Sequence, residues 1–455
     1  MVISAVLIVR NEEDCLEGCL KSVSNVADEV VVVDTGSEDG TIAVARSLTD
    51  RVYGFTWRDD FSAARNAALE HAAGDYVLHV DADERVVQPD SARGLLEAFA
   101  VNRGPAVVGT VAVRSPIWTG REPLEAIDHI PRFFKRGSFL YQGAIHEQIT
   151  PISGEMTIAP TGLELFHTGY AHGPDSPKDK SSRNRRLLRK ELEKCPGDAY
   201  CLYQFGKTHF AVKEYGEAAP FFEQALESLR LDCAARVPCP QGGTAAPPFL
   251  SDLVVSLAYC YANTARATEA RDLLERHKTR GHTGARDPDL HHALGYVYLM
   301  LGDVARSRAA YFDSLRAGPS QERVVGTGSF ASHYHLGLLC ESERDLDGAL
   351  EHYAVSLRIK PDYRASLARC IDMIGEYGVP LPAEVWDVCD QAPFSALFLD
   401  KLSTLLREGA QEDAHRLVHA ARDVSENLYR RCEKSLGEFN GGGSQGQTEK
   451  GAPCD

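Results

Sequence analysis

The stretch LHVDADE at residues 78–84 decides the fold, because an apolar, strand-like run ends there in three acids, Asp81, Asp83 and Glu84. Carboxylates at the tip of a buried strand repel one another, so we expect a positive group to compensate for them. A lysine, the N-terminus of a helix and a divalent cation are the three candidates. The acids stand beyond the carboxyl end of a strand, which is where open α/β sheets bind their ligands.

Upstream of these acids, short β-branched runs alternate with segments of helical periodicity. Such alternation predicts a parallel sheet with helices on both faces. Residues 107–170 change to longer strand-like runs joined by Gly and Pro turns, which predicts mixed or antiparallel strands that complete the same domain. The predicted strands are 3–9, 28–34, 51–57 and 75–81, and the predicted helices are 12–23, 37–48 and 61–74.

From about residue 198 the strand pattern stops and a helical repeat begins. Each of four units carries a small residue that is followed, sixteen positions later, by a large one. This spacing resembles the tetratricopeptide repeat, in which small residues let paired helices approach and large side chains fill the gap. The four pairs are Gly206 with Phe222, Ala258 with Leu274, Gly295 with Tyr311, and Gly337 with Tyr353.

These patterns divide the chain into four predicted parts. We expect an α/β domain over residues 1–175, a basic linker helix over 176–197, a helical repeat domain over 198–436 and a disordered tail over 437–455. The linker helix reads most simply as a solvated charged face, with docking of an anionic lipid or acceptor as the alternative. The tail is rich in Gly, Ser and Gln, a composition typical of disorder.

Composition and charge narrow the class of protein. The formal net charge of −16 argues against nucleic acid as the main partner, since phosphate binding requires a basic face. The apolar N-terminus lacks the cationic region of a signal peptide, and no run approaches the roughly 18 apolar residues that a membrane span requires. The 12 cysteines form no CxxC pair. We therefore expect a cytoplasmic protein with reduced thiols and no membrane span.

Four motifs occur in order, each at a predicted strand end or helix start. They are LIVRNEE at 7–13, VVVDTGSEDGT at 31–41, WRDDFSAARNAAL at 57–69 and HVDADE at 79–84. As an ordered set over roughly residues 1–170, they resemble the nucleotide-sugar-binding half of family 2 glycosyltransferases. The resemblance implies a GT-A fold, that is, a Rossmann-like mixed sheet, here followed by an all-α tetratricopeptide-repeat solenoid.

The resemblance also implies a divalent cation, Mg²⁺ or Mn²⁺, that neutralises the growing charge of a sugar-diphosphate leaving group. Its implied ligands are Asp81, Asp83 and His167, with Asp81 also facing the ribose. An ordinary buried histidine at a strand end is the alternative for His167. For Glu84 there are two alternatives: it helps to orient the sugar, or it starts the next helix.

The nucleotide is expected to lie along the tips of the first strands. Asp34 would bind the nucleoside, although many relatives carry two adjacent acids where this chain has Asp34 and Thr35. The other implied contacts are Asn11, Glu12, Arg65 and Asn66, with Arg132 and Tyr141 as weaker candidates. For Glu12, a favourable first-turn acid of a helix is an equal alternative.

Transfer with inversion requires a base that accepts the proton of the acceptor nucleophile. The motif GAIHEQI at 143–149 offers Glu147 as this base and His146 as the second choice. A solvent-facing His-Glu pair without a catalytic role is the alternative.

The combination of a transferase domain with helical repeats is similar to bacterial peptide S- and O-glycosyltransferases of the sublancin glycosyltransferase type. It implies transfer of a hexose from a nucleotide diphosphate sugar, with UDP as the expected nucleotide, to a protein or peptide that the repeats recognise. Sugar addition to a lipopolysaccharide core and a scaffold with an inactive transferase domain remain as alternatives. Repeats of this kind also serve for homo-oligomerisation.

Overall fold

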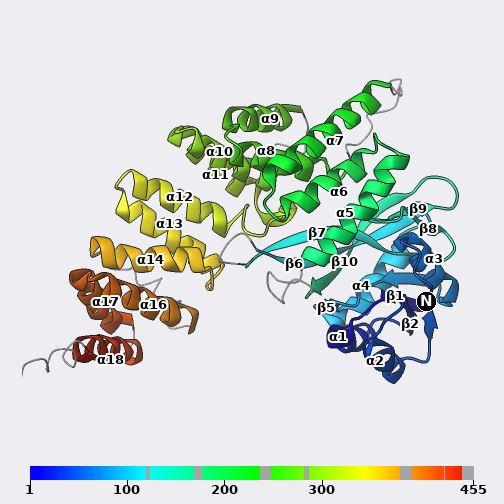
Figure 1. Cartoon of the computed structure of the whole chain (residues 1–455), viewed down its shortest axis with the longest axis horizontal. Helices are drawn as coiled ribbons and strands as arrows, with labels where there is room; N and C mark the ends of the chain where they lie inside the picture. The colour runs from blue at the N-terminus through cyan, green and yellow to red at the C-terminus, as the bar shows by residue number, and fades with distance from the viewer. Residues whose placement is uncertain are drawn as a thin grey trace, which may run out of the picture. The chain divides into compact units, whose positions relative to one another are not determined.

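The chain forms two compact units in a computed structural model that describes residues 1–118, 123–168, 177–235, 247–280, 286–379, 392–424 and 426–442 (Figure 1). The first unit comprises Met1–His277 together with the short segment Arg323–Val325. The second comprises Lys278–Glu322 and Gly326–Asp455.

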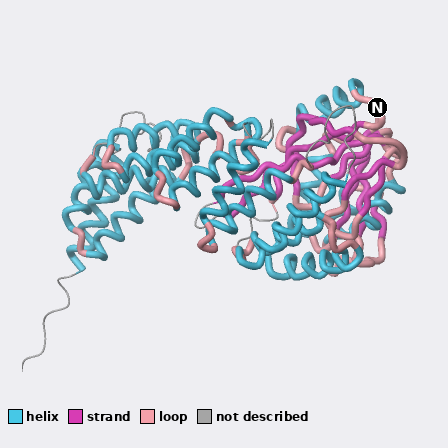
Figure 2. Tube along the Cα trace, turned by 90° about the horizontal axis from the view of Figure 1, so that it is seen from above, coloured by secondary structure: helices cyan, strands magenta, loops and turns pink. Residues whose placement is uncertain are grey.

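A mixed sheet organises the first unit, and Figure 2 shows the strands gathered toward the N-terminal end of the chain. Within the described residues its strand order is β3-β2-β1-β4-β7-β6-β10-β5. Strands β1 to β4 are parallel, as predicted, whereas β7 joins β4 in antiparallel orientation. The strands are β1 Ile3–Val9, β2 Glu29–Asp34, β3 Val52–Gly54, β4 Tyr76–His79, β5 Glu84–Val86, β6 Val107–Trp118, β7 Pro123–Lys135 and β10 Thr157–His167.

Two separate cores cover the two faces of this sheet. On one face lie helices α1 (Glu13–Val23), α2 (Thr41–Leu48) and α4 (Pro89–Asn102). Alternate residues of β1 point to opposite faces, so Leu7 packs in this core and Val6 in the other. The second core contains α3 (Phe61–His71) and a two-stranded antiparallel sheet of β8 (Phe139–Gln142) and β9 (Gln148–Pro151). Helices on both faces confirm the predicted architecture.

Helical pairs follow the sheet. In the first unit they are α5 Pro177–Lys194, α6 Ala199–Phe210, α7 Tyr215–Ala235, α8 Leu250–Asn263 and α9 Ala267–Arg280. The predicted small-to-large pairing is confirmed: a Cβ atom placed on Gly206 would lie 2.6 Å from the Phe222 ring. Only a glycine therefore lets α6 and α7 approach this closely. None of the described helices is long and apolar enough to cross a membrane.

The second unit continues the same packing. Gly295 of α10 faces Tyr311 of α11, whose ring would lie 2.7 Å from an added Cβ. Helix α18 extends to Gly442, so residues 437–442 are helical rather than part of the predicted disordered tail, and residues 443–455 lie outside the described residues. The elements are α10 Pro288–Met300, α11 Val304–Ala317, η2 Pro319–Gln321, α12 Phe330–Ser342, α13 Leu346–Ile359, α14 Arg364–Tyr377, α16 Ala392–Glu408, α17 Gln411–Val424 and α18 Glu426–Gly442.

A histidine that packs against the core of the second unit predicts a pH-dependent stability. His335 stacks on Tyr311 with ring centroids 5.0 Å apart, and burial lowers the pKa of His335 to about 4. The folded state thus favours the neutral ring, so its contribution is complete above the unfolded pKa of about 6.5 and is lost as the pH falls toward 4. Lowering the pH from about 7 to about 5 should therefore reduce the unfolding free energy of the wild type by about 2 kcal/mol more than that of His335→Phe.

Urea unfolding followed by circular dichroism at the two pH values measures this change. His419→Phe is the matched control, because His419 is exposed on α17. An equal pH dependence in wild type and His335→Phe would contradict the prediction.

Candidate active site

The acidic tip of β4 forms a tight turn that leads into β5. The backbone N–H of Glu84 donates to the Asp81 carbonyl at 3.0 Å, and the backbone N–H of Asp81 donates to Glu84 Oε2 at 2.9 Å. Glu84 is buried, and burial raises its pKa to about 7. Glu84 begins strand β5, and helix α4 begins only at Pro89, so the helix-start alternative for Glu84 is wrong.

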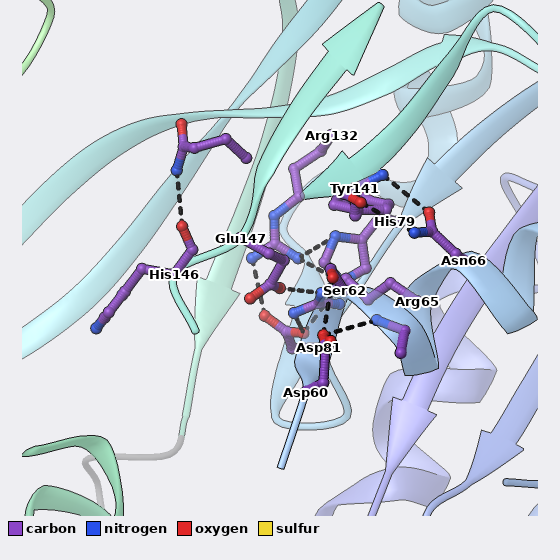
Figure 3. Close-up of polar contacts among 12 residues, drawn as sticks. Asp60, Ser62, Arg65, Asn66, His79, Asp81, Arg132, Tyr141, His146 and Glu147 are labelled. Carbon is purple, nitrogen blue, oxygen red and sulfur yellow. Dashed lines mark hydrogen bonds and ion pairs between the residues drawn. The ribbon is translucent and has the colours of Figure 1, made fainter. Parts of the chain in front are cut away.

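Two arginines compensate for the acids of this turn (Figure 3). Arg132 of β7 binds Asp81 at 2.8 Å and Glu84 at 3.0 Å, and Arg65 of α3 binds Asp81 at 3.2 Å. Burial alone would raise the pKa of Asp81, but the charges of Arg132 and Arg65 lower it well below its usual value. Two guanidinium groups therefore supply the positive charge at this turn. Arginine was not among the three predicted compensating groups.

His79 completes this cluster from the last position of β4. Its Nε2 lies 3.2 Å from Asp81 Oδ1 and 3.3 Å from Arg132 Nη1. Burial, reinforced by the charges of Arg65 and Arg132, lowers the pKa of His79 well below its usual value, so the ring is neutral. No role was predicted for His79, although its position two residues before Asp81 in HVDADE was an available signal.

Glu147 is the carboxylate that the structure brings to Arg65 from a distant segment. The two side chains form an ion pair between Glu147 Oε1 and Arg65 Nε, and only about a tenth of each side chain is exposed. In Figure 3, Glu147 points toward Arg65, whereas the ring of His146 points away from this pair. Of the two predicted base candidates, only Glu147 therefore joins the cluster.

Ile145, two residues before Glu147, anchors the loop that carries this glutamate. The Ile145 side chain packs in a hydrophobic core with Leu187 and Leu188 of α5 and with Cys201 and Phe205 of α6. His146, the next residue, has a φ of 50°, a left-handed conformation that costs energy for a residue with a Cβ. The first helices after the sheet thus fix the position of the Glu147 carboxylate.

A histidine–aspartate pair lies at the end of β10. Nε2 of His167 lies 3.0 Å from Asp83 Oδ2, and its Nδ1 lies 3.4 Å from Ser115 Oγ. The backbone N–H of Thr168 donates to the Asp83 carbonyl at 2.7 Å and fixes the turn. Burial alone would lower the pKa of His167, but the hydrogen bond with Asp83 raises it. The structure therefore brings two of the three predicted metal ligands together.

The side chains present fit a divalent cation only in part. Among the described residues, no group of three or more His, Cys, Asp or Glu side chains is arranged to hold a metal. Asp83 and His167 offer one oxygen and one nitrogen toward each other, whereas Asp81 is bound by two arginines. Mg²⁺ in proteins commonly takes one or two carboxylates, with water and substrate phosphates as the remaining ligands. The Asp83–His167 pair fits this incomplete type of site.

The predicted nucleotide contacts at the tips of β1 and β2 also lie together. Val9 pairs with Asp34 in the parallel ladder, so the two strands end side by side. Asn11 Oδ1 accepts from the Glu38 backbone N–H at 2.8 Å, and Asp34 Oδ2 accepts from the Ser37 backbone N–H at 3.2 Å. Asn11 has a φ of 55°, which turns the chain at the strand end. The loop that follows β2 is thereby fastened to both strands.

Glu12 and Asn66 have local structural contacts. The Glu12 backbone N–H donates to Thr41 Oγ1 at 2.7 Å, and Glu12 directly precedes α1. The Asn66 amide donates to the Tyr141 carbonyl at 2.9 Å and accepts from the Tyr141 backbone N–H at 2.8 Å. Asn66 thus acts like an additional strand residue that fixes β8 to α3, and its side chain faces β8.

Comparison with known proteins agrees with this architecture. Residues 4–158 match the family described as "Glycosyl transferase family 2". A TPR repeat-containing protein of Synechococcus elongatus is 30% identical over 247 residues, which cover 51% of this chain and 59% of that protein. The SPbeta prophage-derived glycosyltransferase SunS of Bacillus subtilis is 24% identical over 236 residues, which cover 49% of this chain and 53% of SunS.

The lipopolysaccharide core biosynthesis glycosyltransferase LpsC of Rhizobium meliloti is 33% identical over 175 residues, which cover 36% of this chain and 62% of LpsC. The chain thus spans little more than half the length of the first two relatives. The matched region contains the β4 tip, both arginines and Glu147. Residues 4–158 of this chain are thus similar to glycosyl transferase family 2.

Proposed function

We propose that the protein is a cytoplasmic, metal-dependent, inverting glycosyltransferase that moves a hexose from a UDP-sugar to a protein or peptide acceptor. The observation that carries this proposal is the cluster of Arg65, Asp81, Arg132 and Glu147 at the carboxyl end of β4. Four segments far apart in the sequence contribute to it. A buried cluster of opposite charges at a sheet edge is typical of a catalytic site.

In the proposed reaction, Glu147 removes the proton from the acceptor nucleophile. The nucleophile forms a bond to the anomeric carbon as the bond from that carbon to the diphosphate oxygen breaks, and UDP leaves with the bonding electron pair. Attack from the side opposite the leaving group inverts the configuration. Glu147 suits this role because its carboxylate is nearly buried and held in one direction by Arg65.

We propose that the donor lies along the strand tips, with the nucleoside at Asn11, Glu12 and Asp34. A divalent cation held by Asp83 and His167 would neutralise the diphosphate. Arg65 is a second source of positive charge, because its Nη1 is buried and has no hydrogen-bond partner among the described residues. We assign Asn66 to holding β8 in place rather than to the nucleotide.

For the acceptor, the repeats favour a protein or peptide. Helices α6 to α9 belong to the same compact unit as the transferase sheet, and α6 supports the Glu147 loop. We propose that donor chemistry resides in residues 1–175, that 176–197 join this part to the repeats and that 198–436 bind the acceptor. Because one relative is named for lipopolysaccharide core biosynthesis, transfer to a lipid-core sugar is the second candidate.

Substitution Asp83→Asn tests the metal-dependent donor site. It removes a carboxylate charge with little change in shape, so UDP binding in the presence of Mn²⁺ should weaken at least about tenfold. Binding without metal should be unchanged. Isothermal titration calorimetry with UDP, with and without Mn²⁺, measures both quantities.

Asp90→Asn is the matched control, since Asp90 is an exposed acid in the first turn of α4. Unchanged UDP affinity of Asp83→Asn in Mn²⁺ would remove Asp83 from the metal site. Hydrolysis of a UDP-sugar panel by the wild type separates the enzyme from a scaffold. A wild type that hydrolyses no UDP-sugar and does not bind UDP would favour the scaffold.

A further inference from the structure

Three aromatic side chains gather at the start of the helical region of the first unit. The ring of Tyr203 stacks on Phe249 with centroids 5.1 Å apart, and Tyr200 meets Phe249 edge to face at 5.3 Å. Tyr200 and Tyr203 lie 6.2 Å apart on α6. We call Tyr200, Tyr203 and Phe249 the aromatic shelf. Neither the donor site nor the proposed base uses it.

The aromatic shelf lies next to the loop that carries Glu147. Cys201, which follows Tyr200 in α6, packs in the same core as Ile145 of that loop. Burial raises the pKa of Tyr200, hydrogen bonds with the side chains of Gln204 and Gln148 lower it, and Glu147 is close enough to raise it electrostatically. Gln148 directly follows Glu147 in the chain, so Tyr200 meets the segment that carries the proposed base.

Buried charges hold the base of the aromatic shelf in place. The Tyr203 hydroxyl donates to Asp252 of α8, and Lys207 Nζ binds the same carboxylate at 2.9 Å. Arg323 also pairs with Asp252 and binds Asp128 of β7 at 2.7 Å. Tyr203 is buried in this network, whereas Tyr200 and Phe249 are only half-buried and keep part of their surface open to solvent.

We propose that Tyr200 and Phe249 form the acceptor subsite, where a peptide chain rests on the rings while its nucleophilic side chain reaches Glu147. This inference rests on the proposed function and deepens it by assigning acceptor-positioning residues. Aromatic rings bind peptide side chains with a large contact area and little loss of conformational entropy. The amides of Gln148 and Gln204 both donate and accept hydrogen bonds, as peptide groups do.

The charges around the aromatic shelf favour a neutral acceptor segment. Asp252 and Asp128 are both paired with cations, so the shelf offers neither a free guanidinium for phosphate nor a free carboxylate for lysine. A phosphorylated lipid-core sugar would meet no unpaired cation among these residues. A peptide with an apolar residue beside its Cys, Ser or Thr nucleophile matches the surface better.

Substitution Tyr200→Ala tests the acceptor subsite by separating transfer from hydrolysis. The probes are the UDP-sugar that the wild type hydrolyses fastest and a library of synthetic peptides with a central Cys, Ser or Thr and random flanks. We expect kcat/KM for the peptides to fall about tenfold or more, mainly through a higher KM. Hydrolysis of the donor by water should stay within about twofold of wild type. Tyr200→Phe should recover most of the peptide transfer, because it keeps the ring.

Tyr377→Ala is the control for loss of an exposed tyrosine, on α14. If Tyr200→Ala unfolds, Phe249→Leu replaces it, since leucine keeps apolar volume but removes the ring. Peptide transfer at wild-type level in the substituted chain overturns the inference. So does a wild type that hydrolyses the donor and glycosylates a core oligosaccharide but no peptide. A wild type without donor hydrolysis instead contradicts the proposed function itself.

Discussion

Glu147→Gln is expected to lower both donor hydrolysis and acceptor transfer by about 10²- to 10⁴-fold, the usual contribution of a positioned general base. Glutamine keeps the size of the side chain and still accepts a hydrogen bond from Arg65, but it cannot take up a proton. Because Arg65 keeps its charge and its ion pair with Asp81 in this variant, UDP affinity should change far less than the rate. Steady-state kinetics and calorimetry with UDP measure the two effects separately.

The control for Glu147→Gln is Glu155→Gln, an exposed glutamate that follows β9 in the same part of the chain. His146→Gln provides the comparison with the second base candidate. The His146 ring points away from Arg65, so its loss should lower the rate far less than the loss of Glu147. An active Glu147→Gln chain combined with an inactive His146→Gln chain would transfer the role of base to His146.

Local sequence patterns predicted the main elements of the fold. Runs such as EVVVVD form strands because β-branched residues suit a pleated, buried surface, and β2 occupies Glu29–Asp34 as expected. The small-to-large spacing of the repeats was equally informative, as the contact of Gly206 with Phe222 illustrates. Strand β5, Glu84–Val86, was missed because three residues carry no periodicity, and only its pairing with β10 makes them a strand.

The residues of the site were predicted more completely than their partners. Asp81, Glu147 and Arg65 were all candidates, yet their mutual contacts join positions 16 and 82 residues apart in sequence. No local pattern reports such pairings, since they arise from the order of strands in the sheet. Arg132 was only a weaker candidate, and its importance follows from β7 lying beside β4.

Arg132→Met is expected to reduce the free energy of unfolding by about 3 to 5 kcal/mol, the usual cost of removing one partner from a buried ion pair. The Arg132 side chain is 5% exposed and binds two carboxylates, Asp81 and Glu84, the second of which is 2% exposed. Methionine fills much of the volume but leaves both acids without this cation, and only Asp81 retains a second one in Arg65. The midpoint and slope of urea unfolding measure the change.

Two further variants separate loss of charge from loss of packing at Arg132. Arg132→Lys keeps the charge but loses the planar group that contacts both acids, so we expect an intermediate destabilisation. Arg103→Met, at an exposed position after α4, should change the unfolding free energy by less than about 0.5 kcal/mol. If Arg132→Met were as stable as the Arg103→Met control, Asp81 and Glu84 would have to be compensated by another group. A divalent cation, one of the three compensating groups predicted from the sequence of this turn, would then be the first candidate.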